Sequence, residues 1–288
     1  MADFRARRPL GQTGLMVSRL GIGSSFGAPA RVIEEAVDQG VNYLYWGSIR
    51  RPAFGRAMRS VARRKREDLV LTVQSYSRVA ALVGPSVDVA LARSGVEYFD
   101  VLLLGMRNEH PADAYVEAFL RLKERGKVRF LALSTHNRPL LPALFRAHSE
   151  GASPYDIFMF RYNAVHRGAE QDVFPFLPAE RPPGVIAYTA TRWGHLLDAA
   201  KMPAGEPPAT ASDCYRFALT RPEVDLVLCG PADREQMQEA LRALDLGPLD
   251  EGELERLRRI GDHVYRNHKP QLGDRGDAQS DSKGAAAA

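Results

Sequence analysis

The feature that most constrains this chain is an alternation of short apolar, β-rich runs with amphipathic helical stretches. Runs this uniformly apolar are typical of strands buried on both faces, as parallel sheets require. The eight runs span residues 19–24, 41–46, 69–74, 100–106, 128–134, 156–163, 184–190 and 224–230. Their number and order predict one repeated strand-helix unit rather than a sandwich of antiparallel strands.

The helical stretches lie between these runs. In the first of them Val32, Ile33 and Val37 recur at helical spacing before Gly40, which is a favourable residue just after a helix. Eight strands followed by helices at this length predict an α/β protein with a closed (β/α)8 TIM barrel. A doubly wound open sheet is the alternative, but the glycines of 21–27 miss the dinucleotide-binding spacing by one residue.

Composition excludes several other classes. The chain has 288 residues, 45% of them hydrophobic and 26% charged, which is ordinary for a globular protein. Its two cysteines, Cys214 and Cys229, favour neither a disulfide framework nor a thiolate metal site, and no histidine spacing suggests a metal. No long apolar run and no signal-peptide core occur, so we expect a cytoplasmic protein without a membrane partner.

The charge balance is mildly basic, with a net charge of +4 and a pI of about 9.1. The densest basic cluster, 63–66, falls at a predicted helix end, where cations complement the helix dipole. Because no aromatic platform accompanies it, we expect no nucleic-acid partner. We expect one domain over residues 1–268 and a disordered tail over 269–288, which is small, polar and lacks core residues.

Several segments resemble the aldo-keto reductases in their residues, order and spacing, over roughly residues 8 to 265. They are 8–24, 40–44, 66–74, 126–137, 161–177 and 184–190. The resemblance implies a barrel that begins with a β-hairpin and binds NADPH at the carboxyl ends of its strands. It also implies hydride transfer between nicotinamide and a carbonyl group.

In that family a tyrosine donates the proton, and its pKa is lowered by a lysine paired with an aspartate, while a histidine orients the substrate. Carried across by motif, the aspartate position is Tyr45, the tyrosine position Arg50, the lysine position Gln74 and the histidine position Gly105. A free phenol titrates near 10, so it needs a nearby cation to act as an acid at neutral pH. We therefore expect altered chemistry in place of standard carbonyl reduction.

The residues that would hold the cofactor are partly kept. Of the family's nicotinamide-binding residues, Ser134 is retained, Thr135 replaces an asparagine and Met159 replaces a glutamine. Tyr188 is retained where a tyrosine stacks on the ring. These positions make NADP(H) a possible cofactor.

The segment after the eighth run resembles the loop and helix that hold the adenosine 2′-phosphate. Gly230 lies in that loop, and the following helix start is an anion site through its free N–H groups. Gln236 stands where an arginine often binds the phosphate, and Ala240 where an asparagine meets adenine. Arg234 offers the nearby positive charge.

Barrel geometry gathers the residues after each strand at one mouth. Several arginines and aromatic side chains fall there. They predict a small anionic or planar aromatic ligand, bound by bidentate guanidinium hydrogen bonds and by ring stacking. We select Trp46, Arg161, Arg192 and Trp193 as substrate-binding candidates. His195 is a candidate general acid or base, although a lone histidine in a loop is more often a surface residue, and the same holds for His136. For Arg161 the alternative to ligand binding is a structural ion pair inside the barrel.

Three functions remain open from the sequence. The first is an oxidoreductase by descent that still binds NADP(H) but uses altered chemistry. The second is a non-catalytic ligand sensor or scaffold, because the tetrad positions are substituted. The third is a barrel recruited to non-redox work such as isomerisation or elimination. The sequence does not distinguish oligomeric states.

Overall fold

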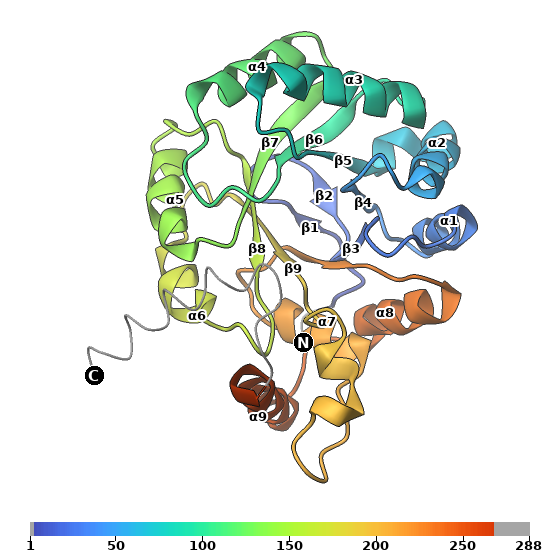
Figure 1. Cartoon of the computed structure of the whole chain (residues 1–288), viewed down its shortest axis with the longest axis vertical. Helices are drawn as coiled ribbons and strands as arrows, with labels where there is room; N and C mark the ends of the chain where they lie inside the picture. Colours follow the sequence, from blue (N-terminus) through green and yellow to red (C-terminus); the bar gives the residue numbers. More distant parts are fainter. Residues whose placement is uncertain (1–2, 268–288) are drawn as a thin grey trace.

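A computed structural model describes residues 3–267 as a closed barrel of eight parallel strands surrounded by helices (Figure 1). The strands are β3 (Leu20–Gly23), β4 (Tyr43–Trp46), β5 (Val70–Ser75), β6 (Phe99–Leu104), β7 (Val128–Thr135), β8 (Ile157–Arg161), β9 (Gly184–Tyr188) and β10 (Leu226–Cys229). They follow chain order around the barrel, and β10 closes it against β3. The predicted TIM barrel is confirmed, and each apolar run contains one strand.

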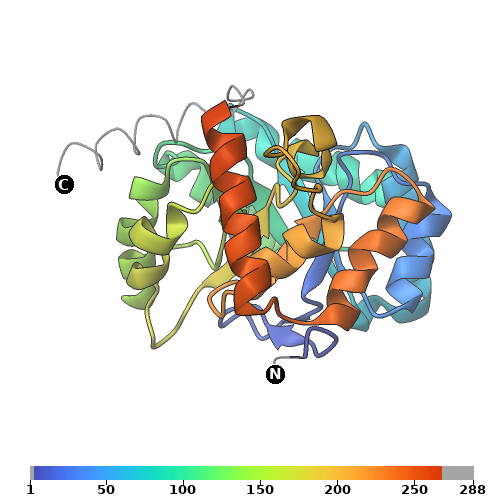
Figure 2. The same ribbon diagram turned by 90° about the horizontal axis from the view of Figure 1, so that it is seen from below.

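The predicted N-terminal hairpin is also confirmed. Strands β1 (Arg8–Pro9) and β2 (Met16–Val17) pair antiparallel. Gly11, with φ of 51°, brings the hairpin against Gly184 so closely that a Cβ atom there would overlap the backbone. Leu10 and Val17 pack into the apolar interior of the barrel, so the hairpin closes the end opposite the strand carboxyl termini (Figure 2).

Helices cover the outer face of the barrel. They are α1 (Ala30–Asp38), α2 (Pro52–Lys65), α3 (Val83–Ser94), α4 (Asp113–Glu124), α5 (Leu141–Ser149), α6 (Ala169–Asp172), α7 (Ala211–Leu219), α8 (Arg234–Leu246) and α9 (Glu251–Asn267). Short 3-10 turns add η1 (Arg66–Asp68), η2 (Ala80–Leu82), η3 (Arg138–Leu140), η4 (Phe174–Phe176), η5 (His195–Leu197) and η6 (Ala199–Lys201). Each main helix buries one apolar face against the strands, as the periodicity predicts.

Two apolar clusters divide the core. One fills the barrel and contains Tyr43 and Tyr45, and the other lies between barrel and helices and contains Leu44 and Trp46. Successive strand residues point to opposite faces, so every second residue belongs to the interior. This alternation decides which residues near the strand ends can reach the mouth.

The basic cluster 63–66 lies at the end of α2 and is partly neutralised by neighbouring carboxylates. Lys65 and Arg64 pair with Asp38, and Arg66 pairs with the buried Asp100. Within residues 3–267, no helix has the length and apolar character that crossing a membrane needs. The stretch 269–288, for which disorder is the prediction, lies outside the described residues.

Candidate active site

A cleft opens at the carboxyl ends of the strands and has two joined chambers. The inner chamber has a volume of about 250 Å³ and the outer one about 720 Å³. The inner chamber lies over β4, β5, β7, β8 and β9, whereas the outer one lies between the loop after β9 and the start of α8. Phe26, Thr191, Trp193, Tyr215 and Gly230 line both.

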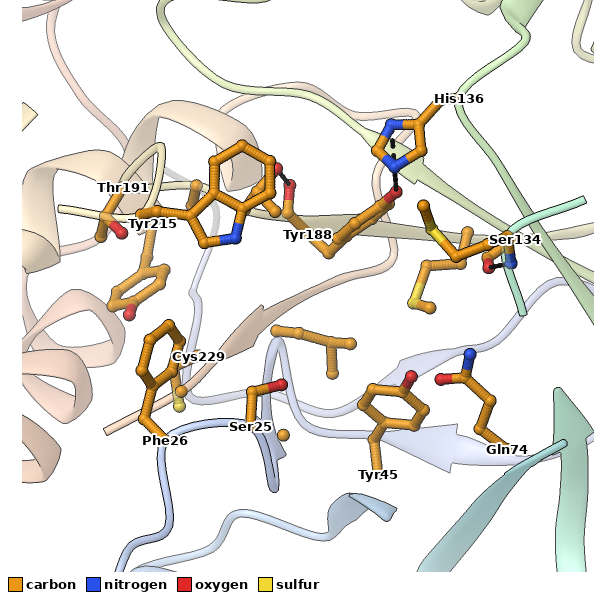
Figure 3. Close-up of a pocket in the computed structure, with 18 of the residues that line it drawn as sticks. Ser25, Phe26, Tyr45, Gln74, Ser134, His136, Tyr188, Thr191, Tyr215 and Cys229 are labelled. Carbon is orange, nitrogen blue, oxygen red and sulfur yellow. Dashed lines mark hydrogen bonds between the residues drawn. The ribbon is translucent and has the colours of Figure 1, made fainter. Parts of the chain in front are cut away.

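Two of the four positions that the sequence resemblance assigns to the family's tetrad lie on the wall of the inner chamber. These are Tyr45, from β4, and Gln74, from β5 (Figure 3). A Cβ atom on Gly105 would overlap the Nε2 atom of Gln74. The amide of Gln74 therefore occupies the space that any side chain at 105 would need.

Tyr45 is buried, with 8% of its surface exposed. Burial, which disfavours the phenolate, raises the pKa of Tyr45 well above its ordinary value, and the neighbouring phenol of Tyr76 raises it further. No lysine or arginine lines the inner chamber among the described residues, so nothing on its wall offsets this rise. Tyr45 remains protonated and is a poor acid at neutral pH.

Two predicted mouth residues lie elsewhere. Arg50 is exposed in the turn before α2 and does not line the cleft. Trp46 was expected to bind substrate, but it lies on the outer face of the barrel, where its indole packs against Gly55 and donates to the carbonyl of Arg51 at 3.2 Å. Strand alternation explains this position, since Trp46 directly follows the inward-facing Tyr45.

The arginines expected at the mouth do not line the cleft either. Arg161 and Arg192 are buried, with 3% and 1% exposed, and Arg107 stacks on Tyr115 and donates to the carbonyl of Ser77. The guanidinium groups are thus directed into the protein instead of into the cleft. The expectation of an anionic ligand loses its basis, whereas that of an aromatic ligand keeps its support.

The loop after β9 carries the remaining candidates, Trp193 and His195. Arg192 and Trp193 have φ of 50° and 52°, a left-handed conformation that costs free energy in residues other than glycine. This backbone places Trp193 on the walls of both chambers, as predicted. His195 is buried in η5 and lines neither chamber, so the structure does not bring this proposed acid or base to the site.

The predicted nicotinamide-binding residues are only partly gathered. Ser134 and Met159 line the inner chamber, and the Ser134 hydroxyl accepts a hydrogen bond from the backbone N–H of Met106 at 2.8 Å. Thr135 is fully buried and absent from the wall, because it lies on the other face of β7.

Tyr188 lines the inner chamber and contacts His136, which the sequence places at the barrel mouth. Its hydroxyl lies 2.9 Å from Nε2 of His136, a hydrogen-bond distance, and both residues line the chamber (Figure 3). His136 is 5% exposed, although a surface position was the favoured reading of the sequence. The sequence contains a signal for this position: His136 comes two residues after Ser134, so strand alternation directs both side chains to the interior of the barrel.

The outer chamber contains the predicted phosphate-binding segment. Gly230 lies against the ring of Phe26, and Gln236 uses its side-chain oxygen to accept from the N–H of Ala232 at 2.9 Å. Arg234 does not line the chamber and instead pairs with Glu35 at 2.5 Å. The charge that was expected to bind the 2′-phosphate is therefore already engaged.

Carboxylates replace cations on this wall. Asp233, Glu235 and Glu239 line the outer chamber, and the described residues add no lysine or arginine there. Asp233 already caps α8 by accepting from the N–H of Gln236 at 2.9 Å. Burial opposes ionisation of Glu239, but hydrogen bonds from Ser212 and the charge of Arg242 outweigh it and lower its pKa.

These residues do not fit NADP(H). A dinucleotide phosphate is bound by cations and free N–H groups, whereas this wall carries carboxylates, and Asp233 already takes the N–H of Gln236 at the start of α8. Ser134 and Tyr188, where the resemblance places the nicotinamide, both line the inner chamber. Within residues 3–267, no cluster of histidine, cysteine and carboxylate side chains suits a metal ion.

Comparison with solved structures shows the same fold. The aldo-keto reductase AKR11C1 from Bacillus halodurans superposes in its holo form with a TM-score of 0.73 at 21% identity, covering 92% of this chain and 99% of that one. Its apo form gives a TM-score of 0.71 over the same shares. The resemblance found in the sequence is thus confirmed at the level of the fold.

Sequence relatives are distant. An uncharacterized oxidoreductase of Bacillus subtilis, YqkF, is 22% identical over 91% of this chain and 99% of its own length. L-galactose dehydrogenase of Arabidopsis thaliana is 23% identical over 82% of this chain and 87% of its own. No family model matches the chain.

Proposed function

We propose that this chain belongs to the aldo-keto reductase family, is an oxidoreductase by descent, and now performs proton transfer on a small aromatic ligand without NADP(H). The observation that carries this proposal is the hydrogen bond between Tyr188 and His136 on the wall of the inner chamber. The proposal places the protein in the cytoplasm and assigns it a small-molecule partner.

The pair is suited to acid-base work because it joins a phenol to the side chain that ordinarily titrates near neutral pH. In the forward step, Tyr188 gives its hydroxyl proton to an acceptor atom of the ligand. It takes a proton back from Nε2 of a protonated His136, which becomes neutral imidazole. The same two proton transfers in reverse order remove a proton from the ligand. The pair therefore supports isomerisation, or proton exchange, at a carbon beside a carbonyl.

Standard carbonyl reduction has weaker support. By the resemblance Tyr45 stands at the family's aspartate position, and burial raises its pKa. Gln74 supplies no charge at the lysine position, and Arg50 lies outside the cleft. The groups that would donate and tune the proton are thus absent from this part of the inner chamber.

An NADP(H)-linked oxidoreductase is the second candidate. Ser134 and Tyr188 favour it, because both lie on the chamber wall where the family resemblance places the nicotinamide. The names of the two relatives, an oxidoreductase and a dehydrogenase, agree with it. A non-catalytic ligand-binding protein is the remaining alternative.

One experiment separates the three. Phenylacetone, a ketone with an aromatic substituent, is incubated with the protein in deuterated buffer, with and without NADPH. NMR follows α-proton exchange and absorbance follows NADPH. Exchange without cofactor supports the proposal. NADPH consumption supports the oxidoreductase, and saturable binding of the ketone without either reaction supports the non-catalytic alternative.

A further inference from the structure

The charge of the cleft is the starting point. Apart from phenols and the Cys229 thiol, the described wall of the inner chamber has one ionisable side chain, His136. On the described wall of the outer chamber the ionisable side chains are, again apart from phenols, the carboxylates of Asp233, Glu235 and Glu239. A ligand that spans both chambers therefore meets negative charge at one end. Coulomb attraction across a cleft with apolar walls favours a positively charged group there.

The walls are aromatic. Phe26, Trp193 and Tyr215 line both chambers, and Tyr45, Tyr76 and Tyr188 line the inner one. The face of an aromatic ring carries partial negative charge and attracts ammonium groups, most strongly for tryptophan. Apolar burial and attraction to a cation thus come from the same residues.

An independent observation comes from the floor of the inner chamber. The Oε1 atom of Gln74 is buried and accepts no hydrogen bond from the described residues, although Gln74 lines the chamber. Figure 3 shows this oxygen directed toward Tyr45 in the chamber instead of toward the strand behind it. A buried amide oxygen without a partner is costly, so the chamber favours a ligand that brings an N–H donor.

From these observations we propose that the cleft binds an organic cation, an amine carried on an aromatic or alkyl body, in place of a dinucleotide phosphate. The ammonium group lies among the aromatic rings of the inner chamber and donates an N–H to Oε1 of Gln74, while the carboxylates of the outer chamber attract it at longer range. This inference uses the pocket of the proposed function but does not require that Tyr188 and His136 catalyse anything.

Three probes of one shape test the charge preference. They are 2-phenylethylamine, 2-phenylethanol and 3-phenylpropionate, titrated against the fluorescence of Trp193 in the Trp46→Phe protein at low ionic strength. We expect the amine to bind roughly tenfold more tightly than the alcohol and the propionate to bind most weakly. Propionate binding as tight as that of the amine overturns the inference, and so does absence of amine binding up to about 10 mM.

Substitutions locate the interaction. Glu235→Gln should weaken amine binding about threefold at low salt and leave alcohol binding unchanged, because it removes one nearby charge. Glu251→Gln is the matched control, since Glu251 also lies in the first turn of a helix, α9, but lines neither chamber. Equal effects of the two changes overturn the assignment of the cation to this cleft.

The Gln74→Leu variant tests the contact between the ligand and Oε1 of Gln74 in the inner chamber. It should weaken the amine more than the alcohol, and alcohol binding reports whether the variant folds with an intact chamber. A variant that binds both probes as the unmodified protein does contradicts the role of Gln74. If the ketone shows no proton exchange but the protein still prefers the amine, the proposed catalysis is rejected and the proposed ligand class is retained.

Discussion

The hydroxyl of Tyr188 and Nε2 of His136 are 2.9 Å apart and join the ends of two strands that are not neighbours in the barrel. β8 lies between β7, which ends just before His136, and β9, which ends with Tyr188. The contact therefore passes over the end of β8, on the wall of the inner chamber that both residues line.

Tyr188→Phe should reduce cofactor-independent proton exchange at least a hundredfold, the usual range for loss of a general acid or base being about 10² to 10⁴. Exchange rates by NMR provide the measurement, and the pH titration of the His136 ring signal should also change. Tyr265→Phe is the control, because that ring packs on His166 and lines neither chamber. Equal rates in the two variants would remove the pair from the reaction.

Gly105→Ala should destabilise the protein by about 1–3 kcal/mol, because its Cβ atom would overlap Gln74 and force a repacking. Gln74→Ala in the same chain should recover most of that loss. Denaturant unfolding of the two single variants and the double variant gives the coupling free energy directly. Simple additivity of the two changes would show that the side chains at 74 and 105 do not share the space.

The protein should unfold in alkali as its buried phenols ionise. Burial raises the pKa of Tyr155 to about 12 and that of Tyr45 well above its usual range, whereas phenols in the unfolded chain titrate near 10. The folded state holds these protons more firmly, so their stabilising contribution is complete below about pH 10 and is lost as pH rises through the folded values. Phenolate absorbance and circular dichroism should change together, and full ionisation near pH 10 with an intact fold would contradict this.

The two tryptophans should respond differently to a soluble quencher. Trp46 is 1% exposed on the outer face of the barrel, whereas Trp193 is half-buried on the cleft wall. Acrylamide should therefore quench the Trp46→Phe protein strongly and the Trp193→Phe protein weakly. Similar quenching of both would place Trp46 nearer the cleft than the structure does.

The strands were predictable because a strand in a closed barrel is covered on both faces, which leaves an apolar run in the sequence. The motif resemblance assigns tetrad positions to residues 45, 50, 74 and 105, which remains a prediction, and of these Tyr45 and Gln74 line the cleft. Here local sequence carries the information, since each position is fixed by its distance from a strand.

The positions of the charged side chains were not predictable in this way. Arg107 meets Tyr115 and Ser77, and Arg234 meets Glu35 from the far end of the chain. Such partners are brought together only by the closed barrel, so a count of arginines near strand ends overstates the positive charge at the mouth. The contact of His136 with Tyr188 depends on the same closure.

We propose that this cleft does not suit NADP(H). The most direct test is a calorimetric titration of the intact protein with NADPH and, separately, with NADH at physiological salt. The account predicts no saturable binding of either at concentrations up to about 1 mM. A dissociation constant for NADPH of about 10 μM or tighter, weakened by Arg234→Ala, would contradict it.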